Sequence, residues 1–309
     1  MSETLQHACD NALSWPLPGS GRTLARWQAL SALADEDLVV GRLVEAHADA
    51  VAIAAELDGP PPAPGQRWGV WAAEGPGMRV EARPTDGGWT LTGRKPWCSG
   101  AHLLTHAQVT AAAGGGRRLF AVQLAQPGVR PLTGCWTGPG MAGADTQDVL
   151  MDGAAGAPIG GVDSYLNRPG FWLGGIGVAA CWYGGALALA RPLAAAARTR
   201  DDPHLRAHAG AVHVALRAAG ALLRQIATEV DAEPAGPHHA RAQTARASIA
   251  ATAAEVLDRV GRALGPAPLA RDARHARLAT DLTVYIRQHH AERDLAALGA
   301  DLPPEIELP

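Results

Sequence analysis

The sequence predicts an α+β fold, with N-terminal helices, a small central β-barrel or sandwich domain, and a C-terminal four-helix bundle. Apolar residues recur with helical periodicity at both ends of the 309-residue chain. A Gly- and Pro-rich linker at residues 59–65 ends the first helical part, and short alternating apolar runs with glycine turns follow it. We therefore divide the chain into residues 1–65, 66–160 and 161–309.

The first helical part covers residues 23–57, where Ala, Leu and Val recur at steps of three and four. In the central part five strands are expected, around turns at Asp86-Gly87-Gly88 and at three consecutive glycines, because glycine supplies the positive φ that hairpin turns need. The expected strands are residues 67–74, 78–85, 89–100, 106–113 and 117–124.

The third part is helical again. Residues 170–190 carry no charge and could span a membrane by length, but their glycines favour a helix buried in a bundle or a subunit interface. Asp202-Pro203 is an N-cap followed by proline at the first helical position. Two apolar seams follow, over residues 205–230 and 245–263, and a final helix or pair of helices is expected over residues 271–298.

Composition limits the partners and the compartment. A net charge of -3 gives no electrostatic reason to expect nucleic acid or an anionic membrane. The four cysteines lie far apart without a CxxC pair, so we expect no metal site and no disulfide framework. Reduced thiols and an N-terminus unlike a signal peptide favour a cytoplasmic protein.

Local sequence in the central part resembles the acyl-CoA dehydrogenase family. VWAAEGPGMRV (residues 70–80) is similar to that family's first flavin strand, and GRKPWCSGA (residues 93–101) is similar to its second. VRPLTGCWTGPGMAGADTQDVLMDG (residues 129–153) resembles the family stretch that carries Gly-Met, Asp-Thr and a closing strand. DLVVGRLVEAHADAV and RDARHARLATDL, which begin at Asp37 and Arg271, resemble its last N-terminal helix and the segment before its C-terminal helices.

The resemblance implies FAD as the cofactor, an acyl-CoA or another acyl thioester as the substrate, and an electron-transfer flavoprotein as a possible partner. It also implies a homo-oligomer, a dimer or a tetramer, which the Ala-rich helices favour as well. Trp97 would stack beside the flavin ring, and Ser99 or its backbone N–H would reach the ring nitrogen that accepts hydride. The cofactor-binding set is Trp71, Ala72, Ala73, Trp97, Cys98 and Ser99.

Each assignment has a plainer alternative. A tryptophan on a strand usually packs in a core, so Trp97 could be a core residue of the β domain. Gly77 and Arg79 occupy positions where the family approaches the thioester and its phosphates, and the alternative is a turn glycine and a solvated arginine.

The family's catalytic glutamate has no counterpart, because counting from Arg271 places it at Thr280, which cannot act as a base unaided at neutral pH. Asp281 and Glu292 are the substitute candidates, with surface or helix-capping roles as the alternative. The family's Arg-x-x-Phe-Gly is also absent, and the N-terminal helices are short.

These departures leave three functions open. The first is a flavin-dependent oxidoreductase that oxidises an acyl thioester. The second is a flavin-dependent monooxygenase of the same fold, which activates oxygen and needs no carboxylate base. The third is a non-catalytic homologue that serves as a partner subunit.

Overall fold

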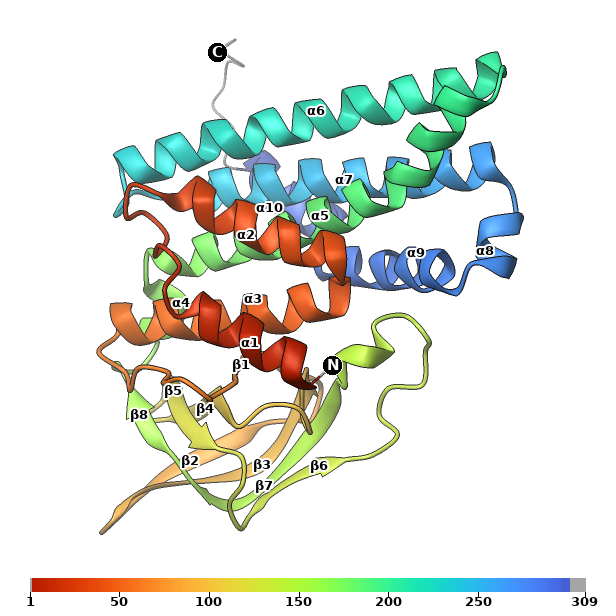
Figure 1. Cartoon of the computed structure of the whole chain (residues 1–309). Coiled ribbons are helices and arrows are strands. Elements are labelled where there is room, and N and C mark those ends of the chain that lie inside the picture. The colour runs from red at the N-terminus through yellow and green to blue at the C-terminus, as the bar shows by residue number, and fades with distance from the viewer. Residues whose placement is uncertain (1, 301–309) are drawn as a thin grey trace. The chain divides into compact units, whose positions relative to one another are not determined.

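The computed structural model describes residues 2–300, in which helices are followed by a sheet and then by further helices (Figure 1). The chain forms two compact units. The first comprises Met1–Leu17, Arg42–Gly138 and Ala142–Phe171. The second comprises Pro18–Gly41, Pro139–Met141 and Trp172–Pro309. The three-part division at residues 65 and 160 stays a prediction.

The first unit contains an eight-stranded mixed sheet in the order β6-β7-β3-β2-β4-β5-β8, with β1 paired in parallel to β4. The strands are β1 (Trp68–Trp71), β2 (Val80–Thr85), β3 (Gly88–Cys98), β4 (His106–Ala113), β5 (Gly116–Gln123), β6 (Val129–Leu132), β7 (Gln147–Ala155) and β8 (Ala157–Ile159). The hairpins β2–β3 and β4–β5 confirm both predicted turns. In the second turn Gly114 and Gly115 have φ of +61° and +87°, which glycine adopts without strain.

One face of the sheet is closed by a core of alternating apolar residues, among them Leu91, Val109, Phe120, Val149 and Met151, all fully buried. The helices of this unit are α1 (Ser2–Ala12), α4 (Ser164–Asn167) and the part of α3 (Leu38–Glu56) that follows Gly41. Helix α1 was not predicted, although its buried Leu5, Ala8, Cys9 and Ala12 have helical spacing.

The second unit is helical. It holds α2 (Thr23–Glu36), most of α5 (Gly170–Thr199), α6 (Pro203–Ala232), α7 (His239–Leu264), α8 (Ala267–Arg271), α9 (Ala273–Tyr285) and α10 (Glu292–Ala300). The predicted cap of α6 is confirmed, because the Asp202 carboxylate accepts the backbone N–H groups of His204 and Leu205. The two predicted seams supply the buried faces of α6 and α7.

The helical segment predicted over residues 23–57 is present, and Asp37 divides it into α2 and α3. Asp37 is extended, with φ of -149°, and its carboxylate accepts the N–H groups of Val39 and Val40. A residue whose side chain caps the next helix cannot continue the helix before it. The apolar period runs through the break and therefore hides it.

Helix α5 is long and apolar enough to cross a membrane by length and composition, and 67% of that apolar window is buried inside the structure. The prediction of a buried helix is confirmed. Its glycines allow close packing, since a Cβ at Gly184 would lie 2.1 Å from the Ser31 carbonyl oxygen. The helix extends beyond the predicted residue 190 to Thr199, through Pro192.

Candidate functional site

The C-terminal end of β3 turns Trp97 out of the sheet. The register between β3 and β7 shifts between Lys95 and Cys98, as at a β-bulge, and Trp97 has φ of +61°. This backbone conformation costs an L-residue about 1–2 kcal/mol. It leaves the Trp97 indole 59% exposed, while Cys98 returns to the core at 0%. Trp97 is therefore not a core residue, and its outward orientation is held against local strain.

A set of hydrogen bonds holds this turn in place. The buried indole of Trp71 donates from Nε1 to the carbonyl of Ser99 at 3.1 Å. The N–H of Gly100 donates to the carbonyl of Ala144 at 2.7 Å. The hydroxyl groups of Ser99 and Thr146 share a hydrogen bond of 3.0 Å. The turn and the segment before β7 are thereby joined through both backbone and side chains.

Trp136 lies edge-on to Trp97, with ring centroids 6.0 Å apart and planes at 84°. Such edge-to-face pairs are favoured by the ring quadrupoles. Trp136 is half-buried, in the Gly-rich segment between β6 and β7. Together the two indoles form an aromatic surface beside the hydroxyl pair of Ser99 and Thr146. Sequence reasoning missed Trp136 and Thr146, and a tryptophan amid glycines was the available signal.

The end of β1 is braced by a buried lysine. Lys95 is 1% exposed, and its ammonium donates to the carbonyl and to the hydroxyl of Thr110, at 2.8 and 2.7 Å. The Thr110 hydroxyl is also 3.3 Å from the Ala72 carbonyl, to which it donates. Burial lowers the pKa of Lys95 to about 8, against the opposing charge of Glu74. The backbone at Ala72 is thereby connected to β3 and β4.

The predicted cofactor set therefore gathers at one place in the first unit. The Trp71 side chain is 2% exposed, so it supports the turn from the core and does not face a ligand. Ala73 is exposed and Ala72 is half-buried. The Cys98 thiol lies in the core and donates to the Lys95 carbonyl, so only the backbone of Cys98 is available to a ligand.

Gly77 and Arg79 lie in the exposed loop between β1 and β2. This loop packs next to the Trp97 turn, since a Cβ at Gly75 would lie 3.6 Å from Cγ of Pro96. Gly77 has φ of +69° and open space around it. The guanidinium of Arg79 pairs with Glu81 at 3.0 Å, and both side chains are exposed.

Asp281 belongs to the second unit and is 3% exposed. Its carboxylate accepts the backbone N–H of Met141, a residue with φ of +56°. Burial raises the pKa of Asp281, and the Met141 hydrogen bond and Arg277 oppose that shift. Asp281 thus holds a strained backbone segment in place.

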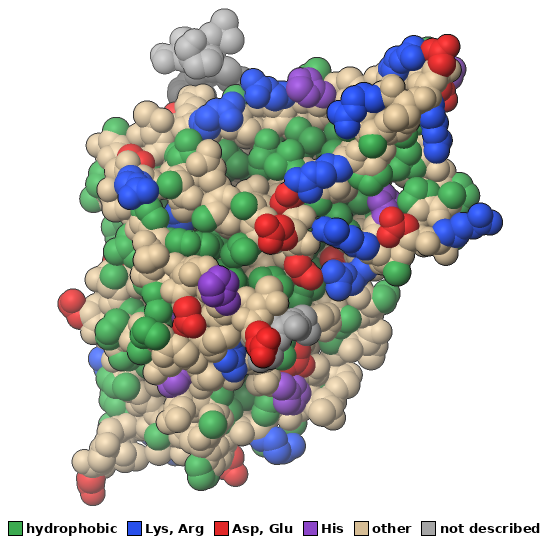
Figure 2. Space-filling view, viewed as in Figure 1, with side chains coloured by type: hydrophobic (Ala, Val, Ile, Leu, Met, Phe, Trp, Pro, Cys, Tyr) green, Lys and Arg blue, Asp and Glu red, His purple; other side chains and the backbone are tan. Residues whose placement is uncertain are grey.

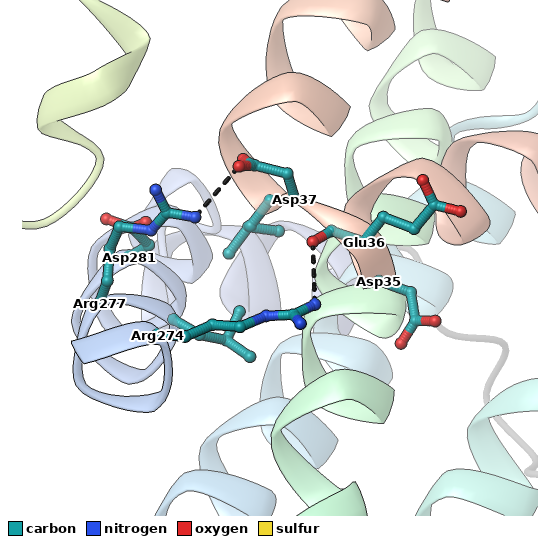
Figure 3. Close-up of a pocket in the computed structure, with 8 residues that line it drawn as sticks. Asp35, Glu36, Asp37, Arg274, Arg277 and Asp281 are labelled. Atoms are coloured by element: carbon teal, nitrogen blue, oxygen red, sulfur yellow. Dashed lines mark hydrogen bonds and ion pairs between the residues drawn. The ribbon is translucent and has the colours of Figure 1, made fainter. Parts of the chain in front are cut away.

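The cavity at Asp281 is small (Figure 3). Arg277 pairs with Asp37 at 3.1 Å, and Arg274 donates to the Glu36 carbonyl at 3.4 Å. The volume of about 20 Å³ accommodates one water molecule. An acyl chain does not fit in this cavity.

Glu292 lies exposed in the first turn of α10, where an acidic residue interacts favourably with the helix dipole. Asp294, which sequence reasoning missed, accepts the N–H of His290 at 3.0 Å, and the His290 ring lies 3.2 Å from it. A hydrogen-bond network is therefore present at this helix end, and it is centred on Asp294. Among residues 2–300 no group of three His, Cys, Asp or Glu side chains could hold a metal ion.

No family model matches the chain, and no curated protein matches it. Solved structures do match. Butyryl-CoA dehydrogenase from Megasphaera elsdenii is 16% identical, with a TM-score of 0.78, over 97% of this chain and 88% of that one. KijD3 in complex with FMN and a dTDP-linked amino keto sugar is 22% identical, with a TM-score of 0.76, over 90% and 79%.

A third match is the dibenzothiophene monooxygenase TdsC from Paenibacillus sp. A11-2, at 20% identity and a TM-score of 0.76, over 88% of this chain and 81% of that one. TdsC has also been solved with FMN bound. At these identities the likeness establishes the fold. The chain has the acyl-CoA dehydrogenase fold, in a shorter form, and the predicted fold class is confirmed.

Proposed function

We propose that this chain is a flavin-dependent oxidoreductase that oxidises an acyl thioester. The Trp97 turn carries the proposal. Strained backbone that the surrounding structure holds in place is concentrated at ligand and active sites. Here the strain presents a large, flat, apolar side chain to solvent, at 59% exposure, where packing would have buried it.

The residues at the turn fit a flavin ring. Its planar face needs an apolar platform, which Trp97 would supply, with Trp136 edge-on beside it. Its polar edge needs hydrogen-bond donors. The Ser99 N–H donates to the Trp97 carbonyl at 3.1 Å, so the Ser99 hydroxyl is the donor that remains available. With Thr146 donating to Ser99, the Ser99 hydroxyl hydrogen is free to point outward.

A bound flavin would accept the hydride that the substrate loses. The protein would hold the ring with Trp97, orient its edge with Ser99 and the backbone of Trp71, Ala72 and Ala73, and position the thioester near Gly77 and Arg79. Asp281 and Glu292 stay the candidate bases of this proposal. Burial raises the pKa of Asp281, and its carboxylate accepts the Met141 N–H. Glu292 is exposed in the first turn of α10.

One observation favours the monooxygenase as a second candidate. The Asp281 carboxylate is committed to the Met141 N–H and borders a cavity with room for one water. A monooxygenase of this fold needs no carboxylate base, and the matched TdsC is described as a monooxygenase. Oxygen consumption by the reduced, flavin-loaded protein separates the two candidates.

The proposal also covers the identity of the flavin, the compartment, the oligomeric state and the electron acceptor. FAD is the cofactor that the sequence resemblance implies, and FMN, which KijD3 and TdsC bind, is the alternative. The protein would work in the cytoplasm as a dimer or tetramer, with an electron-transfer flavoprotein as its electron acceptor. Acid release of the cofactor followed by chromatography identifies the flavin, and light scattering gives the oligomeric state.

The absorbance spectrum of freshly purified protein, and of protein titrated with FAD and with FMN, tests the proposal. We expect the visible bands of a bound flavin, with one flavin per chain at saturation. Protein that is colourless and binds neither flavin would contradict it and would favour the non-catalytic partner subunit.

A further inference from the structure

The second unit contains a pocket of about 330 Å³ between α2, α5 and α6. It is lined by Leu24, Trp27, Gln28, Ser31, Ala32 and Asp35 of α2, Tyr183 and Leu187 of α5, and Gly220, Leu223 and Arg224 of α6. In Figure 2, viewed as in Figure 1, hydrophobic side chains gather where α2 and α6 run side by side, with basic side chains near them. This volume is in the range of natural small-molecule sites.

Specific contacts hold the walls of this pocket in place. The carboxylate of Asp231, on α6, accepts the N–H and the hydroxyl of Thr23 at the first residue of α2, at 3.0 and 2.5 Å. The Tyr183 hydroxyl donates to the Leu216 carbonyl at 3.1 Å. This contact requires glycine at position 220, since a Cβ there would lie 2.6 Å from that hydroxyl. The pocket is therefore built into the packing of three helices.

The lining combines an apolar floor with a positive charge. Trp27 and Leu223 are buried, at 2% and 5% exposure. The one acid of the lining, Asp35, is paired with Arg191. Arg224 has no carboxylate partner among residues 2–300. The local charge is therefore positive, which favours an anion.

Two lining residues have buried polar atoms without a hydrogen-bond partner. They are the indole Nε1 of Trp27 and Oδ1 of Asp35. Buried polar groups are almost always paired with protein or with bound molecules, so an unpaired donor and an unpaired acceptor beside one pocket indicate a missing partner.

We propose that the α2–α5–α6 pocket binds an amphipathic organic carboxylate, with its apolar chain over Trp27 and Leu223 and its carboxylate on Arg224. Its residues all belong to the second unit and none belongs to the proposed flavin set, so the proposal is independent of the proposed function. Octanoate is the probe with this chemistry, and octan-1-ol has the same chain without the charge.

Isothermal titration of the full-length protein with octanoate tests the proposal. We expect saturable binding at one site per chain. Ala32→Trp places a large side chain into the pocket from an exposed position and should abolish binding. Ala218→Trp, at an exposed position of α6 outside the lining, should leave binding unchanged. Retained helical circular dichroism in both variants shows that each has folded.

The charge is tested separately. Arg224→Gln should weaken octanoate binding about fivefold, as expected for a partly exposed ion pair. It should leave octan-1-ol binding unchanged. Arg217→Gln removes the same charge two turns earlier on α6, outside the lining, and should have little effect. No saturable binding of octanoate, equal binding by wild type and Ala32→Trp, or equal losses in the two arginine variants would overturn the proposal.

Discussion

Two strained positions, one in each unit, use the same backbone conformation in opposite ways. Trp97 in the first unit has φ of +61° and presents its side chain at 59% exposure. Met141 in the second has φ of +56°, is 4% exposed, and has its N–H held by the buried Asp281. Strain with an outward, largely exposed side chain indicates a place for a ligand. Strain satisfied by an internal carboxylate indicates a structural lock.

The largest effect is expected at the buried amine that braces the first site. The pKa of Lys95 is lowered from 10.5 to about 8 in the folded protein, so the unfolded chain binds more protons between these values. Stability contributed by this group is therefore present above pH 10.5 and lost as the pH falls through 8. The shift corresponds to about 3 kcal/mol.

Urea unfolding of wild type and Lys95→Met at several pH values measures this. The difference in unfolding free energy between the two should change by about 3 kcal/mol between pH 8 and 10.5, with wild type gaining as the pH rises. Arg79→Met, at an exposed position of the same unit, provides the control. A difference that does not depend on pH would mean that Lys95 is not buried as described.

Removing the Asp281 carboxylate, which holds Met141 in the second unit, should lower the free energy of unfolding by a smaller amount. Asp281→Ala leaves the Met141 N–H buried without an acceptor, which should cost about 2 kcal/mol in unfolding free energy. Burial raises the pKa of Asp281, so its contribution is greatest at acidic pH and is lost as the pH rises through the folded-state pKa. The deficit of the variant should therefore grow as the pH falls. Thr283→Ala, exposed on the same helix, should change stability little, and an equal loss there would contradict the lock.

At the exposed Trp97, in contrast, a substitution should change ligand binding and not stability. Trp97→Ala should weaken flavin binding about tenfold, in line with the free energy of aromatic stacking, and leave stability nearly unchanged. Trp97→Gly should be more stable than Trp97→Ala by about 1 kcal/mol, because glycine adopts positive φ freely. Fluorescence titration measures the flavin affinity and thermal unfolding measures the stability, with Trp15→Ala as the control. A large loss of stability in Trp97→Ala would place the indole in the core.

The smallest effect on stability and flavin affinity is expected at Trp71, the buried residue that supports the Trp97 turn. Trp71→Phe keeps the buried ring but removes the hydrogen bond to the Ser99 carbonyl, at a cost of about 1 kcal/mol. Flavin affinity should fall by less than in Trp97→Ala, since the platform remains. If Trp71→Phe abolished flavin binding while Trp97→Ala did not, the assignment of the platform would be reversed.

The elements that the sequence predicts well are those whose signals are local. Strand β4 and the cap at Asp202 follow from a short apolar run and from one side chain next to the backbone that it caps. The apolar period continues across the break at Asp37 and does not reveal it, whereas the segment that resembles the family's last N-terminal helix begins at that residue. Helix α1 was missed although its buried residues have the expected spacing.

In the candidate site, too, local sequence identifies some residues, but the contacts between distant residues cannot be predicted from it. Trp97 and Ser99 could be found from a resemblance in sequence, but their exposure could not, because it depends on a bulge that shifts β3 against a strand 50 residues later. Thr146 comes to the turn through that same pairing, and Trp136 contacts Trp97 from the segment between β6 and β7. The role of Asp281 depends on Met141, which is 140 residues away in the chain. No local pattern specifies such contacts.

A crystal structure of the protein soaked with FAD or FMN tests the central claim most directly. We predict that the Trp97 indole stays turned outward, with the flavin ring against it and a ring edge within hydrogen-bond distance of Ser99. An indole turned into the core, or a flavin bound elsewhere with this surface bare, would contradict the account.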